Sequence, residues 1–178
     1  MWKMICLGFL AASAAAACGG EIPSAVKPFL ADPALQPVKA KAFVLRKPGV
    51  YAVRDASGNP QGTLYVETIG DNERQKGYAG TIEVAILADN QNRVAGVLIG
   101  RNHETPNYLN RVRKSGFLKS WNKLKLEEVP GKQVDTVTRA TYSSGAILSG
   151  VRKLAAARAA EDKAGTAPPV KAVRKEAQ

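Results

Sequence analysis

Alternating apolar and polar residues in the first half of the chain predict β-strands joined by short turns. One face of the period-two pattern over residues 81–88 holds Ile82, Val84, Ile86 and Ala88. Shorter apolar runs lie at 50–53, 63–66 and 94–99. The segments 55–60 and 89–92 between these runs are rich in Asp, Asn, Gly and Pro, which favour turns. We therefore expect two successive hairpins and a mainly antiparallel sheet.

Two stretches in the second half have the residue spacing of helices. Thr105 and Pro106 provide an N-cap and a proline at the first helical position, and Gly116 ends this stretch. A second helix is expected further on, with Ser143 or Ser144 as its cap. Its apolar face consists of Ile147, Val151, Leu154 and Ala155. Strands followed by helices predict an α+β fold, in which a few helices pack on a twisted antiparallel sheet in a single domain.

The N-terminal residues 1–17 have the layout of a secretory signal peptide. Lys3 precedes an apolar run, which is followed by alanines. This run is shorter than the roughly 20 residues of a membrane-spanning helix, and a buried N-terminal helix is the alternative interpretation. Cleavage before Cys18 with lipidation of its thiol competes with ordinary cleavage after Ala17. We expect an exported protein, either periplasmic or anchored on the extracytoplasmic side of a membrane.

Segments without clear periodicity flank the predicted domain. Residues 18–40 hold several prolines and many alanines, which predicts an extended spacer. The domain itself is expected over residues 41–160. Residues 161–178 include Pro168 and Pro169 among scattered charges, and we expect a disordered tail there.

Composition narrows the chemistry that the domain can perform. The formal net charge is +11, and many of the basic residues lie between positions 101 and 132. This excess suits an anionic ligand, an acidic partner protein or an anionic membrane surface. Nucleic acid is not an expected partner, because export and the absence of a stacking-aromatic motif argue against it. With His103 as the single histidine and Cys18 as the single cysteine beyond the signal segment, redox chemistry would need an organic cofactor.

Hydroxyl side chains gather at the start of the second predicted helix. They are Thr138, Thr141, Tyr142, Ser143 and Ser144. Unpaired backbone N–H groups and the helix dipole make such a helix start a ready site for phosphate. Hydroxyls at this place can donate to phosphate oxygens, and one of them could accept a phosphoryl ester. A hydroxyl-rich helix cap without a ligand is the alternative that these residues alone leave open.

The segment 135–144 resembles the attachment motif of the flavin-binding domain in flavin subunits of sodium-pumping quinone reductases and related electron-transport complexes. That motif reads Asp, two variable residues, Ser or Thr, usually Gly, and then Ala-Thr, often followed by a Ser/Thr pair. The matching residues are Asp135, Thr138, Ala140, Thr141, Ser143 and Ser144. Arg139 stands where the family usually has Gly.

Two further elements resemble the same family, and the whole resemblance covers about residues 50–154. The sequence Gly-Tyr-Ala-Gly at 77–80 is similar to a Gly-Tyr-x-Gly element. The sequence His-Glu-Thr-Pro at 103–106 is similar to a His-x-Glu-Thr-Pro element, with Asn107 in place of the Gly that usually follows.

The resemblance implies that Thr141 receives FMN through a phosphoester made by a separate flavin transferase, which uses FAD. Asp135 and Ala140 would then serve recognition by the transferase. Thr138, Ser143 and Ser144 would hold the phosphate. Glu104 and Thr105 would lie near the flavin, although capping of the helix at Pro106 is an alternative role for Glu104. Tyr78 and Tyr108 could flank the flavin ring or pack in the core.

The implied function is extracytoplasmic electron transfer through covalently held FMN. We expect an electron carrier or a subunit of a redox complex rather than a stand-alone enzyme. Its partners would be the flavin transferase, a redox protein of acidic character, and a membrane if Cys18 is lipidated. The alternative function is an exported lipoprotein that keeps the fold but works as a binding or scaffold module without redox chemistry.

Overall fold

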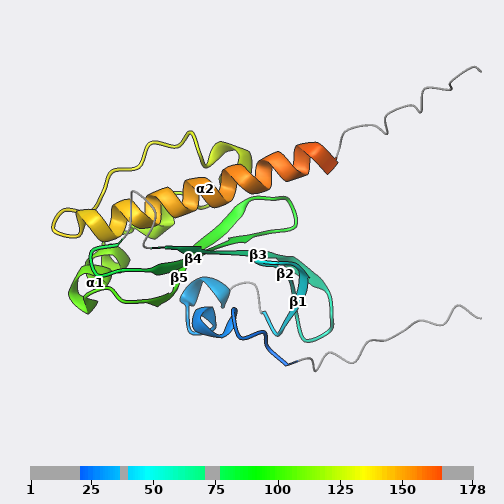
Figure 1. The fold of residues 1–178 in the computed structure, drawn as a ribbon. Coiled ribbons are helices and arrows are strands. Elements are labelled where there is room, and N and C mark those ends of the chain that lie inside the picture. The colour runs from blue at the N-terminus through cyan, green and yellow to red at the C-terminus, as the bar shows by residue number, and fades with distance from the viewer. Residues whose placement is uncertain (1–20, 37–39, 71–76, 166–178) are drawn as a thin grey trace, which may run out of the picture.

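The computed structural model describes residues 21–36, 40–70 and 77–165, and a five-stranded antiparallel sheet lies at its centre (Figure 1). The strands are β1 (Ala42–Lys47), β2 (Val50–Arg54), β3 (Pro60–Ile69), β4 (Ile82–Ala88) and β5 (Val94–Asn102). Their order in the sheet is their order in the chain, so each strand pairs with its neighbour in sequence. The expected α+β fold with hairpin connections is confirmed.

The strand β4 contributes to a hydrophobic core on each face of the sheet. Its residues Ile82, Val84 and Ile86 belong to one core. Ala85 and Leu87 point the other way and belong to the second core. Because both faces are covered, the sheet is the middle of three layers.

The helix α2 (Thr141–Gly165) covers the first face (Figure 1). The four apolar residues predicted for its buried face are all buried there. A Cβ at Gly150 would lie 2.3 Å from Ile69 Cδ1, so glycine lets the helix approach the sheet closely at this position. The helix therefore holds its own N-terminus in a fixed place beside the sheet.

The expected tail from residue 161 onward is wrong for its first residues, since α2 continues to Gly165. The alanines that precede residue 161 are strong helix formers. Glu161 pairs with Lys47 of β1 and with Arg158, and hydrogen bonds from these two side chains lower the pKa of Glu161. Residues 166–178 lie outside the described parts of the chain.

The second face of the sheet is covered by residues 21–36, which had been expected to form a spacer. Two short 3₁₀-helices, η1 (Lys27–Phe29) and η2 (Pro33–Leu35), place Val26, Phe29 and Leu35 in the core with β5 and its neighbours. A Cβ at Gly100 of β5 would lie 2.6 Å from Phe29 Cζ. The extended-spacer interpretation is wrong for this segment, because the prolines start 3₁₀-helices whose apolar residues pack on the sheet.

The remaining elements pack against α2 or β5. They are α1 (Pro106–Lys114), η3 (Phe117–Lys119) and η4 (Leu126–Glu128). The helix α1 begins at Pro106 after Thr105, as predicted, and Gly116 takes a left-handed φ of 78° beyond its end. Trp121 is fully buried and meets Phe117 edge-on.

Among the described helices, none combines the length and the apolar character that crossing a bilayer requires. The predicted signal segment 1–17 and Cys18 lie outside the described residues.

Candidate functional site

Thr141 is the first residue of α2, and its side chain is exposed. Its hydroxyl makes no hydrogen bond within the described parts of the chain. The N-terminus of α2 thus presents a free hydroxyl together with the unpaired N–H groups and the positive end of the helix dipole. This combination suits a phosphate ester.

A tight turn leads into the helix and fixes its first residue. Ala140 N–H donates to Val137 O at 2.9 Å, and Ala140 is buried. Arg139 has a φ of 64°, a left-handed conformation that glycine adopts most easily. This left-handed backbone conformation explains why a Gly suits this position of the motif. In this chain an arginine adopts the same conformation.

The Ser144 hydroxyl stabilises this turn both as a hydrogen-bond donor and as an acceptor. Its Oγ donates to Ala140 O at 2.8 Å and accepts from Val137 N–H at 2.9 Å. Ser144 is fully buried, and it lies inside the first turn of α2. The prediction that Ser143 or Ser144 caps this helix is therefore wrong, because the turn that Ser144 closes lets the helix begin at Thr141.

Ser143 and Glu104 form a buried hydrogen bond between the first turn of α2 and the segment before α1. The Ser143 hydroxyl donates to Glu104 Oε2, and Ala79 N–H donates to Glu104 Oε1 at 2.9 Å. Glu104 is 6% exposed and Ser143 is 1% exposed. The alternative role of Glu104 as a cap of α1 is wrong, since Thr105 holds the N-cap position and these two partners occupy the carboxylate.

The same carboxylate explains the first glycine of the Gly-Tyr-x-Gly element. A Cβ at Gly77 would lie 2.2 Å from Glu104 Oε1, so no larger residue fits there without displacing the carboxylate. Glu104 thus connects residues 77–79 to the helix start that bears Thr141. Sequence patterns had given no sign of this connection.

Three tyrosines surround a small hollow next to Thr141. Tyr78 meets Tyr108 edge-on at 5.4 Å between ring centroids and lies 6.3 Å from the Tyr142 ring. The hollow has a volume of about 260 Å³, and Thr141 lines it with the three rings. Tyr78 is 60% exposed and Tyr142 is 72% exposed. We call this place the tyrosine hollow.

The tyrosine hollow has the aromatic lining that a planar ring would contact. Aromatic faces and edges bind such rings through stacking and edge contacts, and large exposed rings mark interaction sites. The sequence indicated Tyr142 as one of the hydroxyls at the helix start, but not as a ring that could flank the flavin. Its position next to Thr141 was the one available signal, since exposure cannot be read from the residue type.

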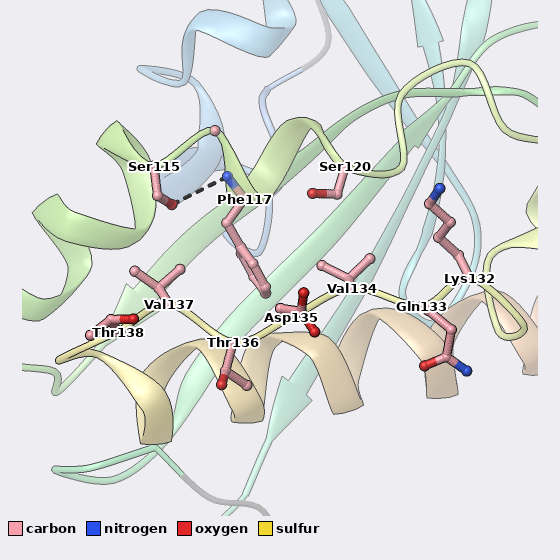
Figure 2. A pocket seen from close by; sticks show the side chains of 11 residues that line it. Ser115, Phe117, Ser120, Lys132, Gln133, Val134, Asp135, Thr136, Val137 and Thr138 are labelled. Carbon is pink, nitrogen blue, oxygen red and sulfur yellow. Dashed lines mark hydrogen bonds between the residues drawn. The ribbon is translucent and has the colours of Figure 1, made fainter.

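Asp135 and Thr138 line a second depression, which shares no lining residue with the tyrosine hollow. This groove of about 660 Å³ runs between residues 115–120 and residues 132–138 (Figure 2). Asp135 and Thr138 are exposed there, and the Asp135 carboxylate has no hydrogen bond or ion pair with any described residue. We call this depression the Asp135 groove.

The remaining candidate residues lie at the edges of the site. Thr105 is exposed and its side chain does not cap α1. His103 is exposed, and its Nδ1 lies 3.1 Å from Thr81 Oγ1. Across the described ranges, no cluster of His, Cys, Asp and Glu could hold a metal ion.

The basic residues between positions 101 and 132 are on the surface. Arg101 pairs with Glu83 at 3.3 Å, and Lys125 lies 3.9 Å from Glu127. The others are exposed and make no ion pair with a described residue: Arg111, Arg113, Lys114, Lys119, Lys123 and Lys132. Their charge is available to a partner.

Taken together, the fold and the site define an α+β domain with an exposed hydroxyl at a helix start beside an aromatic hollow. Comparison with known families gives the particular class, because residues 77–156 match the model of the FMN-binding domain. The match spans β4, β5, α1 and most of α2, and it includes all three elements on which the resemblance was based. The suspected resemblance to the FMN-binding domain family is confirmed over these residues. No curated protein matches the chain.

Proposed function

We propose that this protein carries FMN on Thr141 and transfers electrons outside the cytoplasm, as a carrier or as a subunit of a redox complex. The family match supports FMN as the cofactor. The free Thr141 hydroxyl at the start of α2 is the observation that carries the covalent assignment. Bound flavin supplies the redox chemistry, and the protein holds and orients it.

Burial distinguishes Thr141 from the other hydroxyls around it. Ser143 and Ser144 are buried, and their hydroxyl protons are donated to Glu104 and Ala140. Thr138 is exposed but lines the Asp135 groove, whereas Thr141 lines the tyrosine hollow. Thr141 is therefore the hydroxyl that is free, at the helix start and beside the aromatic rings.

The attachment reaction that we propose uses FAD as the donor and a separate flavin transferase as the enzyme. A new bond forms between Thr141 Oγ and the phosphorus on the FMN side of the FAD diphosphate. The bond from that phosphorus to the bridging oxygen breaks, and AMP leaves. The hydroxyl proton is lost to the surrounding water. No oxidation or reduction occurs in this step.

The phosphate would then be held chiefly by backbone N–H groups of the first turn of α2 and by Thr138. Ser143 and Ser144, the other candidates, can reach a phosphate oxygen only by giving up their present hydrogen bonds. The tyrosine hollow would receive the flavin ring, with Glu104 beneath it as the residue that positions the Tyr78 segment.

Export remains part of this proposal. The signal-like segment 1–17 and Cys18 support a periplasmic or membrane-anchored protein on the extracytoplasmic side. A covalent bond is useful at that location, since a flavin that dissociated there would be lost. The exposed basic residues suit an acidic redox partner or an anionic membrane surface.

The direct test is flavin attachment in cells that also produce a flavin transferase. The wild-type protein should gain the mass of FMN minus water and absorb visible light after denaturation. Thr141→Ala should abolish the mass gain, and Thr141→Ser should retain part of it. Thr136→Ala, at an exposed threonine in a variable position of the motif, serves as the neighbouring control that keeps the bond. Covalent flavin in denatured Thr141→Ala would contradict the assignment. A wild-type protein without flavin would favour the scaffold alternative.

A further inference from the structure

Arg139 is the one charged residue among the described residues that line the tyrosine hollow. The other lining residues are neutral: Tyr78, Tyr108, Ala140, Thr141, Tyr142 and Ser143. Arg139 is exposed, and its guanidinium makes no hydrogen bond or ion pair with any residue that the structure describes. An arginine side chain stays protonated in proteins. The hollow therefore has a full positive charge at its lining.

The backbone at this position favours a different residue. Arg139 has a φ of 64°, in the left-handed region that glycine occupies freely and larger residues occupy at a cost. The hydrogen bonds of Ser144 with Val137 N–H and Ala140 O hold the turn in this form. Glycine, which the motif usually has here, would avoid the cost. A residue held in an unfavourable conformation at a candidate site points to a use for its side chain.

The carboxylate that contacts this lining through Ser143 already has two hydrogen-bond donors. Glu104 accepts from the Ser143 hydroxyl and from Ala79 N–H, and it is 6% exposed. It makes no ion pair with Arg139. A negative charge that formed within the hollow would therefore have the free guanidinium of Arg139 as its cation among the described lining residues.

Reduction of a flavin creates such a charge. The oxidised ring takes up two electrons from a donor and one proton from water, and the product carries one negative charge in the ring. A cation near the ring stabilises this product more than the neutral oxidised ring. Charge placed beside the ring is one of the means by which a protein tunes flavin chemistry. A planar guanidinium can in addition lie flat against an aromatic ring.

We propose that Arg139 contacts the flavin ring in the tyrosine hollow and raises its reduction potential by offsetting the negative charge of the reduced ring. This inference rests on the proposed attachment of FMN to Thr141 and deepens it. The site would then combine three aromatic rings that hold the flavin with one cation that favours its reduced form.

The test measures the midpoint potential of the covalently bound flavin by spectroelectrochemical titration. Arg139→Gln removes the charge and keeps a long polar side chain. Arg139→Gly also removes the charge and has the residue that the motif usually carries, so flavin attachment is retained. In both variants we expect two-electron reduction to become at least fivefold less favourable, which is a potential about 20 mV lower. Arg139→Lys keeps the charge and should stay closer to the wild-type potential than either.

The matched control is Arg113→Gln, which removes the same charge from an exposed arginine of α1 outside the hollow. Its potential should equal that of the wild type, because screened surface charges act weakly at a distance. A lowered potential in Arg139→Gly alone would come from the backbone and would overturn the role of the charge. Wild-type potentials in both neutral variants would overturn the inference while covalent FMN is present. A wild-type protein that gains no flavin from an active transferase would instead overturn the proposed function.

Discussion

Replacing Glu104 by Ala tests whether this carboxylate holds the site together. The change removes the acceptor of the Ser143 hydroxyl and of Ala79 N–H. Ser143 is 1% exposed, so water cannot easily replace its lost partner, whereas Ala79 is exposed and its N–H can bond to water. The two losses should therefore differ in size.

The magnitude follows from these exposures. A hydrogen bond to a charged group contributes about 1.5–3 kcal/mol, and a buried group left unsatisfied costs about 1–3 kcal/mol. We assign most of the loss to Ser143 and about 1 kcal/mol to Ala79 N–H. The variant also avoids the cost of burying a carboxylate, which reduces the sum. Glu104→Ala should lower the free energy of unfolding by roughly 2–4 kcal/mol, and the melting temperature by roughly 6–15 °C.

Urea unfolding, followed by the fluorescence of buried Trp121, measures this loss. Near-ultraviolet circular dichroism of the tyrosines should change as well, because Tyr78 lies between Gly77 and Ala79 of the connected segment. Glu104→Gln keeps one acceptor oxygen and should lose less. The matched control is Glu127→Ala, an exposed glutamate whose loss should stay within about 0.5 kcal/mol. A Glu104→Ala protein as stable as this control, with unchanged tyrosine signals, would refute the positioning role.

Two further predictions concern the surface and the N-terminus. Reversing Lys119, Lys123 and Lys125 to Glu should leave flavin content unchanged and slow reduction by the native donor, most strongly at low salt; stopped-flow rates equal to wild type at every salt concentration would exclude steering by these residues. If Cys18 is lipidated, Cys18→Ser should abolish labelling with fatty acid and release the protein from membranes, while Cys6→Ser within the signal segment should not. Uncleaved protein in the cytoplasm would exclude export.

Most of the sheet could be predicted because its central strands alternate clearly between two environments. The strand β1 could not, since Phe43 is its single buried residue and the exposed Val44 and Leu45 break the alternation. The segment 21–36 was misinterpreted for a related reason. Its apolar residues are few and separated by prolines, and they form a core only because they pack on the second face of the sheet.

The site was predictable where its residues are close in sequence. The motif around Thr141 indicated the acceptor that we propose. The predicted helix start exists, three or four residues earlier than a cap at Ser143 or Ser144 had suggested. The partnership of Glu104 with Ser143 joins residues that are 39 positions apart. No periodicity or propensity encodes such a pair, because it depends on how α1, the 77–80 segment and α2 meet.

That partnership also gives a physical reason for the three short elements of the family to occur together in this chain. Gly77 leaves room for the Glu104 carboxylate, which in turn accepts a hydrogen bond from Ser143. Ser144, next in sequence, closes the turn that places Thr141 at the helix start. Each element alone is a few common residues. Because each one sets the position of the next, together they form one site. A substitution in any of them should therefore change the position of the Thr141 hydroxyl.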